Sequence, residues 1–136
     1  LTGINMTGSS LSMAQLAGAL MNRVNCSDAD LRGAQLVGTN LRGANLSHAR
    51  MNRMRIAGGL EAEWPTNLSN ADMRGTNLKF ADMSNANLER ANLRKADFRD
   101  ANLTEAVFLD TDLTGADFRG ATVTGADFRG AVGYKP

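Results

Sequence analysis

The side chains that could carry chemistry in this sequence are few and scattered. There is one histidine, His48, so a Ser-His-Asp or Cys-His catalytic arrangement would have to use it. The one cysteine, Cys26, falls at an inward position of the repeat described below, where it is predicted to be a small buried hydrophobe. No Cys and His cluster has zinc-ligand spacing, and no loop has the ligand density of a calcium site. The sequence therefore predicts no enzymatic activity, no metal and no cofactor.

Composition sets broad limits on domain count and partners. The 136 residues are enough for one domain, and 15 basic residues against 14 acidic ones give a net charge of +1. This balance provides no strong global field toward nucleic acid or an acidic membrane surface. Without an apolar run of about 18 residues or a signal-peptide pattern, we expect no membrane contact and favour an intracellular, cytoplasmic location. Because the chain opens in the middle of a repeat, we interpret it as a module of a larger protein.

A large apolar residue recurs at every fifth position, here labelled i. Helices need apolar spacing near 3.6 and strands near 2, so neither element explains the pattern. Position i−2 is usually Ala, i−1 Asn or Asp, i+1 polar, and i+2 Gly, Asn or Asp. The i residues of the second half are Leu68, Met73, Leu78, Met83, Leu88, Leu93, Phe98, Leu103, Phe108, Leu113, Phe118, Val123 and Phe128.

These preferences predict a short straight side followed by a corner. Residues two apart point to the same side of an extended segment, and i+2 supplies the positive φ of a type II turn. If corners turn by about 90°, four pentapeptides close a 20-residue coil, and coils stack at about 4.8 Å. Phe98 and Phe118 lie 20 apart, as do Phe108 and Phe128, so we expect two stacked pairs on opposite sides of the interior.

Runs such as residues 86–100, ANLERANLRKADFRD, resemble the A(D/N)LXX motif of the pentapeptide repeat proteins. The resemblance extends over nearly the whole chain and implies an all-β fold, a right-handed quadrilateral β-helix or solenoid. Its handedness comes from the resemblance alone. With 20 residues per coil, 136 residues predict about six to seven coils interrupted by one loop.

The phase shifts once, between Ile56 and Leu68, which are twelve residues apart where ten would keep register. The intervening segment contains Pro65, which makes a ladder strand improbable there. We therefore predict a first array at 1–58, a loop at 59–65, a second array at 66–132 and a tail at 133–136, with one continuous core.

The loop and the stretch before it hold the candidate partner-binding residues. The loop tryptophan either folds back over a corner or is an exposed anchor, since Trp is enriched at binding hot spots. The two loop glutamates either face a partner or pair with the three arginines that precede them. Met54 falls at an i−2 site, where we expect the coil to widen or distort. An outward phenylalanine adds a further contact point. The candidates are Trp64, Glu61, Glu63, Arg50, Arg53, Arg55 and Phe80.

A charged column is expected on one face of the second array. Lys79, Arg99 and Arg119 should stack there, with Asp97 and Asp117 beside them at i−1. We interpret this column as a self-compensating solvated face.

The function predicted from these features is a non-enzymatic protein–protein interaction scaffold without a small-molecule substrate. The loop between two arrays also resembles, more weakly, proteins that join a BTB/potassium-channel-tetramerisation domain to pentapeptide repeats, which implies partner recruitment. One alternative is a DNA-mimicking topoisomerase (gyrase) inhibitor of the quinolone-resistance type, although the charge of +1 disfavours mimicry. Another is nucleic-acid binding through the arginine-rich first array, which lacks a stacking platform. Unpaired strand edges at the ends leave end-to-end self-association open.

Overall fold

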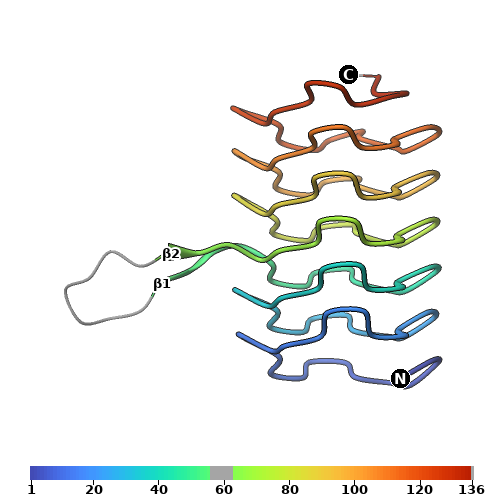
Figure 1. Cartoon of the computed structure of the whole chain (residues 1–136), viewed down its shortest axis with the longest axis vertical. Coiled ribbons are helices and arrows are strands. Elements are labelled where there is room, and N and C mark those ends of the chain that lie inside the picture. Colours follow the sequence, from blue (N-terminus) through green and yellow to red (C-terminus); the bar gives the residue numbers. More distant parts are fainter. Residues whose placement is uncertain (56–62, 136) are drawn as a thin grey trace.

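The computed structural model describes residues 1–55 and 63–135, which form a rod of stacked coils with one lateral projection (Figure 1). The i−1 residues of successive coils pair in four parallel ladders that follow one another around each coil. The ladders begin at Asn5, Ser10, Gln15 and Leu20. Within each array the paired residues lie 20 apart, as the sequence predicts.

The hydrogen bonds explain why each pentapeptide forms a side and a corner. On the side, the N–H of Leu41 donates to the carbonyl of Asp72 in the next coil at 2.8 Å. At the corner, Gly43 has a φ of +63°, and the N–H of Ala44 bonds back to the Leu41 carbonyl at 3.0 Å. This is the type II turn that the glycine at i+2 predicts.

The preference for Asn and Asp at i−1 has a local cause as well. The side-chain oxygen of Asn67 accepts a hydrogen bond from the N–H of Ser69 at 3.0 Å, and Asp82 does the same for Ser84 at 3.1 Å. These bonds occupy N–H groups at the start of the corner that the ladder does not use.

The interior is filled by the i and i−2 side chains. Buried residues from Met21 to Leu113 form one cluster that continues past the projection, as predicted. Cys26 is fully buried within it, which raises the pKa of its thiol.

The phenylalanines stack as the 20-residue period requires. The rings of Phe98 and Phe118 lie 4.8 Å apart at 14°, and those of Phe108 and Phe128 lie 4.8 Å apart at 8°. Tyr134 extends the second column, with its ring 3.8 Å from that of Phe128. Offset ring stacking therefore fills the C-terminal interior.

The projection is a two-stranded antiparallel hairpin, labelled β1 and β2 in Figure 1. Strand β1 spans Met54–Arg55 and β2 spans Glu63–Trp64, with Met54 opposite Trp64 and Arg55 opposite Glu63. We placed Met54 and Arg55 in the first array, and this is wrong, because both already belong to the hairpin. Met54 therefore does not widen a coil. Residues 59–62 of the predicted loop, with Glu61, lie outside the described residues.

The coils resume after the hairpin with an offset of twelve residues. The third ladder passes from Gln35 to Asn67, and the second from Arg50 to Asp82. Leu68 thus stacks on Leu36 in the next coil. A continued count of 20 residues would have assigned this place to Ile56. In residues 1–55 and 63–135 no helix has the length and apolarity needed to cross a bilayer.

Candidate interaction surfaces

The hairpin is anchored at its base by the buried hydroxyl of Thr66. This hydroxyl donates to the carbonyl of Leu31 at 3.0 Å and accepts from the N–H of Gly33 at 3.0 Å. At regular corners the i+2 N–H donates to a carbonyl of the next coil, as Gly43 does to Arg74 at 2.9 Å. Thr66 therefore replaces a ladder bond that the insertion interrupts.

The hairpin base also packs on the corner at Gly33. A Cβ built at this glycine would lie 3.0 Å from the Met54 Cβ, 3.4 Å from the Trp64 carbonyl oxygen and 2.6 Å from the Met13 sulfur. Gly33 has a φ of +68°, so the corner needs glycine for both its backbone and its space.

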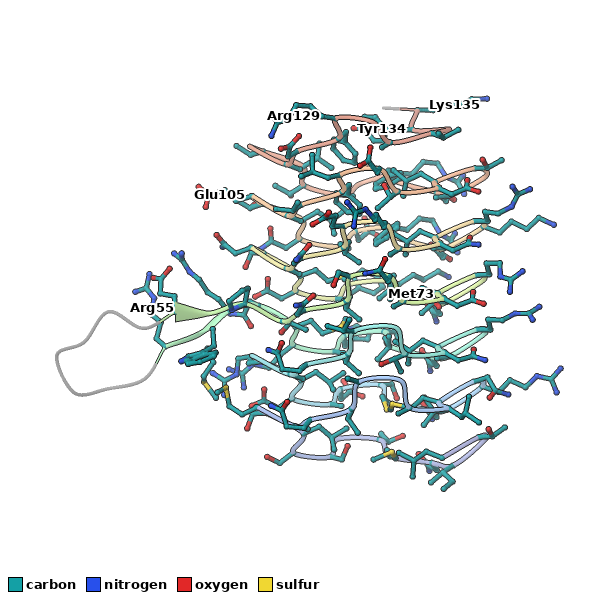
Figure 2. The ribbon with its side chains drawn as sticks, viewed as in Figure 1. Arg55, Met73, Glu105, Arg129, Tyr134 and Lys135 are labelled. Carbon is teal, nitrogen blue, oxygen red and sulfur yellow. The ribbon has the colours of Figure 1, made fainter. Side chains whose placement is uncertain are left out.

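Two of the predicted arginines pair with the hairpin glutamate. Glu63 forms ion pairs with Arg53 and, at 3.5 Å, with Arg55 Nε. Arg55 remains 74% exposed and lies away from the rod (Figure 2). Trp64, in β2, is 46% exposed. Its carbonyl oxygen lies over the Gly33 corner while nearly half of its surface meets solvent, and its role as an anchor for a partner stays a prediction.

The other predicted residues lie elsewhere. Arg50 is 3.9 Å from Asp30 of the preceding coil rather than beside the hairpin glutamate. Phe80 is 51% exposed, and its ring stacks on His48 at 4.8 Å and 14°. A count of 20 residues would place residue 68 next to His48, but the additional offset of twelve residues brings Phe80 there. Among the residues that the structure describes, no group of three or more His, Cys, Asp or Glu side chains could hold a metal ion.

Most arginines at i+1 are clamped by an aspartate of their own pentapeptide. In each pair the guanidinium donates two hydrogen bonds to the i−1 carboxylate, with Nη2–Oδ2 distances of 2.6–2.8 Å. The Arg119 guanidinium and the Arg119 N–H lower the pKa of Asp117 to about 2, and the pKa values of the other four aspartates are lowered in the same way. The pairs are Asp30–Arg32, Asp72–Arg74, Asp97–Arg99, Asp117–Arg119 and Asp127–Arg129.

The predicted column on the first ladder is self-compensating. Lys79 Nζ lies 3.5 Å from Asp97, and Arg99 Nε lies 3.8 Å from Asp117 of the next coil. Each of these cations therefore has an acidic neighbour, as we expected.

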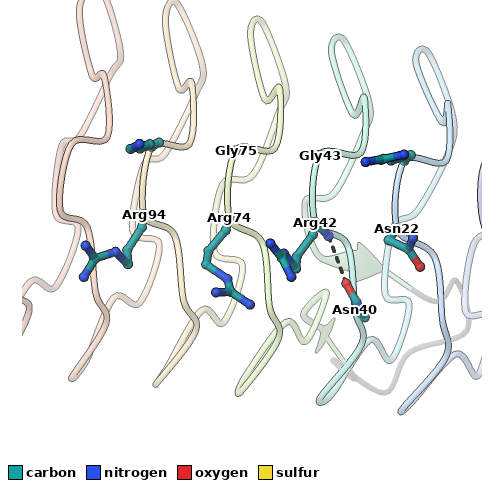
Figure 3. A pocket seen from close by; sticks show the side chains of 9 residues that line it. Asn22, Asn40, Arg42, Gly43, Arg74, Gly75 and Arg94 are labelled. Carbon is teal, nitrogen blue, oxygen red and sulfur yellow. Dashed lines mark hydrogen bonds between the residues drawn. The ribbon is translucent and has the colours of Figure 1, made fainter.

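One column of cations differs from all of these. A groove with a volume of about 630 Å³ follows the corner between the fourth and first ladders (Figure 3). Arg42, Arg74 and Arg94 lie side by side along it on successive coils, with Gly43 and Gly75 at its floor. The groove is lined by Asn22, Arg23, Asn40, Arg42, Gly43, Arg74, Gly75, Arg94 and Lys95.

Comparison with known proteins agrees with this architecture. A model of the pentapeptide repeats matches the sequence in eight copies, over residues 25–57, 66–90 and 91–130. The chain belongs to the pentapeptide repeat family. No curated protein matches the sequence.

Two solved structures with TM-scores above 0.6 share this fold. A trypsin-treated variant of QnrB1, a plasmid-mediated fluoroquinolone resistance protein, is 23% identical over 90% of this chain and 66% of its own, with a TM-score of 0.65. A second such variant is 20% identical over 96% of this chain and 77% of its own, with a TM-score of 0.62. HetL, involved in heterocyst differentiation regulation in the cyanobacterium Nostoc, is 24% identical over 94% and 76%, with a TM-score of 0.40.

Sequence reasoning missed the groove although its signal was present. Arg74 and Arg94 are 20 apart in phase, which places them on successive pentapeptide coils. Arg42 joins them only once the offset of the insertion is known, because it lies 32 residues before Arg74. The column is not apparent from the net charge of either array, because its members come from both arrays and meet only at one corner of the rod.

Proposed function

We propose that this chain is a non-enzymatic protein–protein interaction scaffold, a module whose docking element is the base of the hairpin. In this proposal a right-handed, four-sided rod of about six to seven coils holds the element at a fixed place. The observation that carries the proposal is Trp64, which is 46% exposed on a hairpin that leaves an otherwise regular rod.

The composition of the hairpin base supports this role. Aromatic and arginine side chains dominate binding hot spots, and the hairpin base presents one of each, Trp64 opposite Met54 and the exposed Arg55 opposite Glu63. The buried Thr66 hydroxyl and the contact at Gly33 fix the base before a partner arrives. A fixed base lowers the entropic cost of binding, because less of the surface has to be ordered in the complex.

Quantitative affinity capture from an extract of the source organism tests the proposal. We would compare the wild type with Trp64→Ser and with a matched control, Val132→Ser, which removes an apolar side chain that is 62% exposed on the rod. A partner retained by the control and lost by Trp64→Ser, and then rebound as a purified protein with the same dependence, would support the proposal. Equal capture of every partner by all three proteins would contradict it.

Topoisomerase inhibition by DNA mimicry is the less favoured alternative. The likeness to QnrB1 lies below 25% identity and concerns the fold. Mimicry of duplex DNA needs a negative surface, whereas the groove between the fourth and first ladders is lined by five basic side chains, Arg23, Arg42, Arg74, Arg94 and Lys95. A supercoiling assay with the purified chain tests this alternative directly, and we expect no inhibition.

A further inference from the structure

The groove at the corner between the fourth and first ladders lies diagonally opposite the hairpin. The hairpin leaves the corner between the second and third ladders, and the four ladders follow one another around each coil. The groove is therefore a second surface, independent of the one in the proposed function.

Two of its arginines lack the clamp that holds arginines elsewhere. Arg42 and Arg94 occupy i+1, but their i−1 residues are Asn40 and Asn92 in place of aspartate. Asn40 accepts the backbone N–H of Arg42 at 3.2 Å (Figure 3). Among the described residues no side chain bonds the Arg42 guanidinium, although its charge helps to lower the pKa of Asp72. Arg94 reaches Asp112 of the next coil at 3.2 Å through a single nitrogen.

The groove thus carries unmatched positive charge. It holds five basic side chains, and two carboxylates pair with them, Asp72 with Arg74 and Asp112 with Arg94. Within residues 1–55 and 63–135, Arg23, Arg42 and Lys95 form no ion pair. Three positive charges therefore remain available to an anionic ligand on one corner of a chain whose net charge is +1.

Glycine hollows the middle of this corner. In the i+2 column, Gly43 and Gly75 stand between Arg23 and Lys95. A Cβ at Gly75 would meet nothing within 4 Å, and one at Gly43 would meet only Arg23 Cγ at 3.8 Å. The floor is open, and basic side chains stand at both ends.

The backbone of the groove favours carboxylates over phosphates as ligands. Phosphate sites are commonly cradled by free backbone N–H groups. Here the N–H of Gly43 donates to Arg74 and that of Gly75 to Arg94, at 2.9 and 3.0 Å. Single-stranded nucleic acid also needs aromatic stacking, and none of the lining residues is aromatic.

The spacing of the arginines selects the shape of the ligand. Coils stack at about 4.8 Å, and Arg74, which Asp72 clamps, stands on the coil between Arg42 and Arg94, so these two arginines are separated by about 9.6 Å. Side chains on one face of an extended strand repeat at about 6.6 and 13 Å, and neither spacing matches. Residues seven apart on an α-helix lie on one face and are separated by about 10.5 Å along its axis, which is close to the spacing of the two arginines.

We propose that this groove binds an acidic helix of a partner protein, laid along the rod axis with carboxylates on one face, including a pair at i and i+7. Arg42 binds one of these carboxylates through its planar guanidinium group, which suits bidentate pairing, and Arg94 binds another through the nitrogens that its single bond to Asp112 leaves unused. Arg23 and Lys95 hold further carboxylates at the two ends, and the glycine floor lets the helix approach closely.

A binding titration with two peptides tests this assignment. The probe is an alanine-rich peptide of about 20 residues, long enough to be helical, with glutamates on one face at i, i+3, i+4 and i+7 spacing. Its isomer has the same composition with the glutamates spread around the helix, and a short random-sequence DNA duplex serves as the third ligand. We expect the facial peptide to bind several-fold more tightly than its isomer, with affinity that falls as salt rises.

Two double variants locate the binding. Arg42→Glu with Arg94→Glu should weaken the facial peptide about tenfold. The control reverses two clamped and exposed arginines, Arg119→Glu with Arg129→Glu, which makes the same change in net charge and should leave affinity within about twofold. Thermal unfolding of all the proteins checks that each variant is folded.

Three results would overturn the proposal: equal affinity for the two peptides, equal loss in the two double variants, or no binding of either peptide. Tighter binding of the duplex than of the facial peptide, lost in the Arg42/Arg94 variant, would assign the groove to nucleic acid instead.

Discussion

The corner beneath the hairpin and the corner that carries the groove are built from the same pentapeptide, yet one is covered and the other is open. At the first, Gly33 lies under Met54 and the Trp64 carbonyl, and its N–H is satisfied by the Thr66 hydroxyl. At the second, Gly75 has no neighbour within 4 Å of a Cβ position, and its N–H bonds to the next coil in the regular way. The repeat therefore allows a corner either to support an inserted segment or to remain exposed as a possible binding surface.

The same comparison extends to charge. At clamped positions such as Asp97–Arg99, the arginine is held by the carboxylate of its own pentapeptide. At Asn40 and Arg42 the change from a carboxylate to an amide releases the guanidinium. One polar side chain at i−1 thus decides whether an arginine is clamped by its own pentapeptide, although Arg94, which has Asn92 at i−1, still reaches Asp112 of the next coil.

The largest expected difference between the two corners concerns their threonines. Thr66→Val leaves the N–H of Gly33 buried without a partner, which costs about 1–3 kcal/mol. Thr76→Val near the groove removes only one hydroxyl donor, shared between the carbonyls of Leu41 and Met73, and both carbonyls also accept backbone N–H groups. Urea unfolding should therefore show a clearly lower midpoint for Thr66→Val than for Thr76→Val. Thr66→Ser, which keeps the hydroxyl, should recover most of the loss, and similar midpoints for the two valine variants would break the comparison.

The glycines of the two corners should differ by less. Both Gly33 and Gly75 have positive φ, so alanine costs about 1–2 kcal/mol at either site. At Gly33 the new Cβ would also crowd Met54 and the Met13 sulfur, which adds about 1 kcal/mol or more. Thermal unfolding of Gly33→Ala and Gly75→Ala measures the difference, and an equal loss in both would mean that the hairpin base does not press on its corner.

How far these corners could be predicted from the sequence depends on what fixes each feature. The 20-residue period and the Phe98–Phe118 stack follow from spacing alone, because burial repeats with the coil. The start of the hairpin did not follow, since the five-residue phase continues through Ile56 while the structure places Leu68 above Leu36. A five-residue phase that continues in the sequence carries no mark that the chain has left the rod by Met54.

The groove depends on the same offset, so it could not be predicted without knowing that offset. Arg42 and Arg74 lie 32 apart in the sequence, so no 20-residue count joins them. The offset also brings Phe80 onto His48, a stack that neither residue alone predicts. A site formed by repeats on the two sides of an insertion can be predicted only when the register shift across the insertion is known. That shift is given by which residues pair between coils.

Closing the groove should have a moderate effect on binding. Asn40→Asp with Asn92→Asp installs the clamp of the other pentapeptides, so Arg42 and Arg94 should turn onto their own carboxylates and the facial peptide should bind about fivefold more weakly. Asn45→Asp with Asn67→Asp makes the same charge change where i+1 is serine, and should alter affinity by less than about twofold. A titration at one salt concentration compares the pairs. If both pairs weaken binding equally, net charge rather than the clamp governs the groove.

The smallest expected effect is a difference between two carboxylate titrations. The pKa of Asp117 is lowered to about 2, mainly by its hydrogen bonds from the Arg119 side chain, whereas the pKa of Asp112 is lowered first by the Thr114 hydroxyl and only later by Arg94. Because both values lie below the ordinary 3.8, each carboxylate stabilises the fold above that pH, and Asp117 loses its contribution as the pH falls through about 2.

Carboxyl NMR titrations of two variants compare these partners. Arg119→Gln should move the midpoint of Asp117 up toward 3.8, while Arg94→Gln should move that of Asp112 by much less. A shift of Asp112 as large as that of Asp117 would mean that Arg94 is clamped across coils, and the groove would lose one of its two released guanidinium groups. A small shift means that Arg94 contributes little to Asp112, as a residue that faces a ligand should.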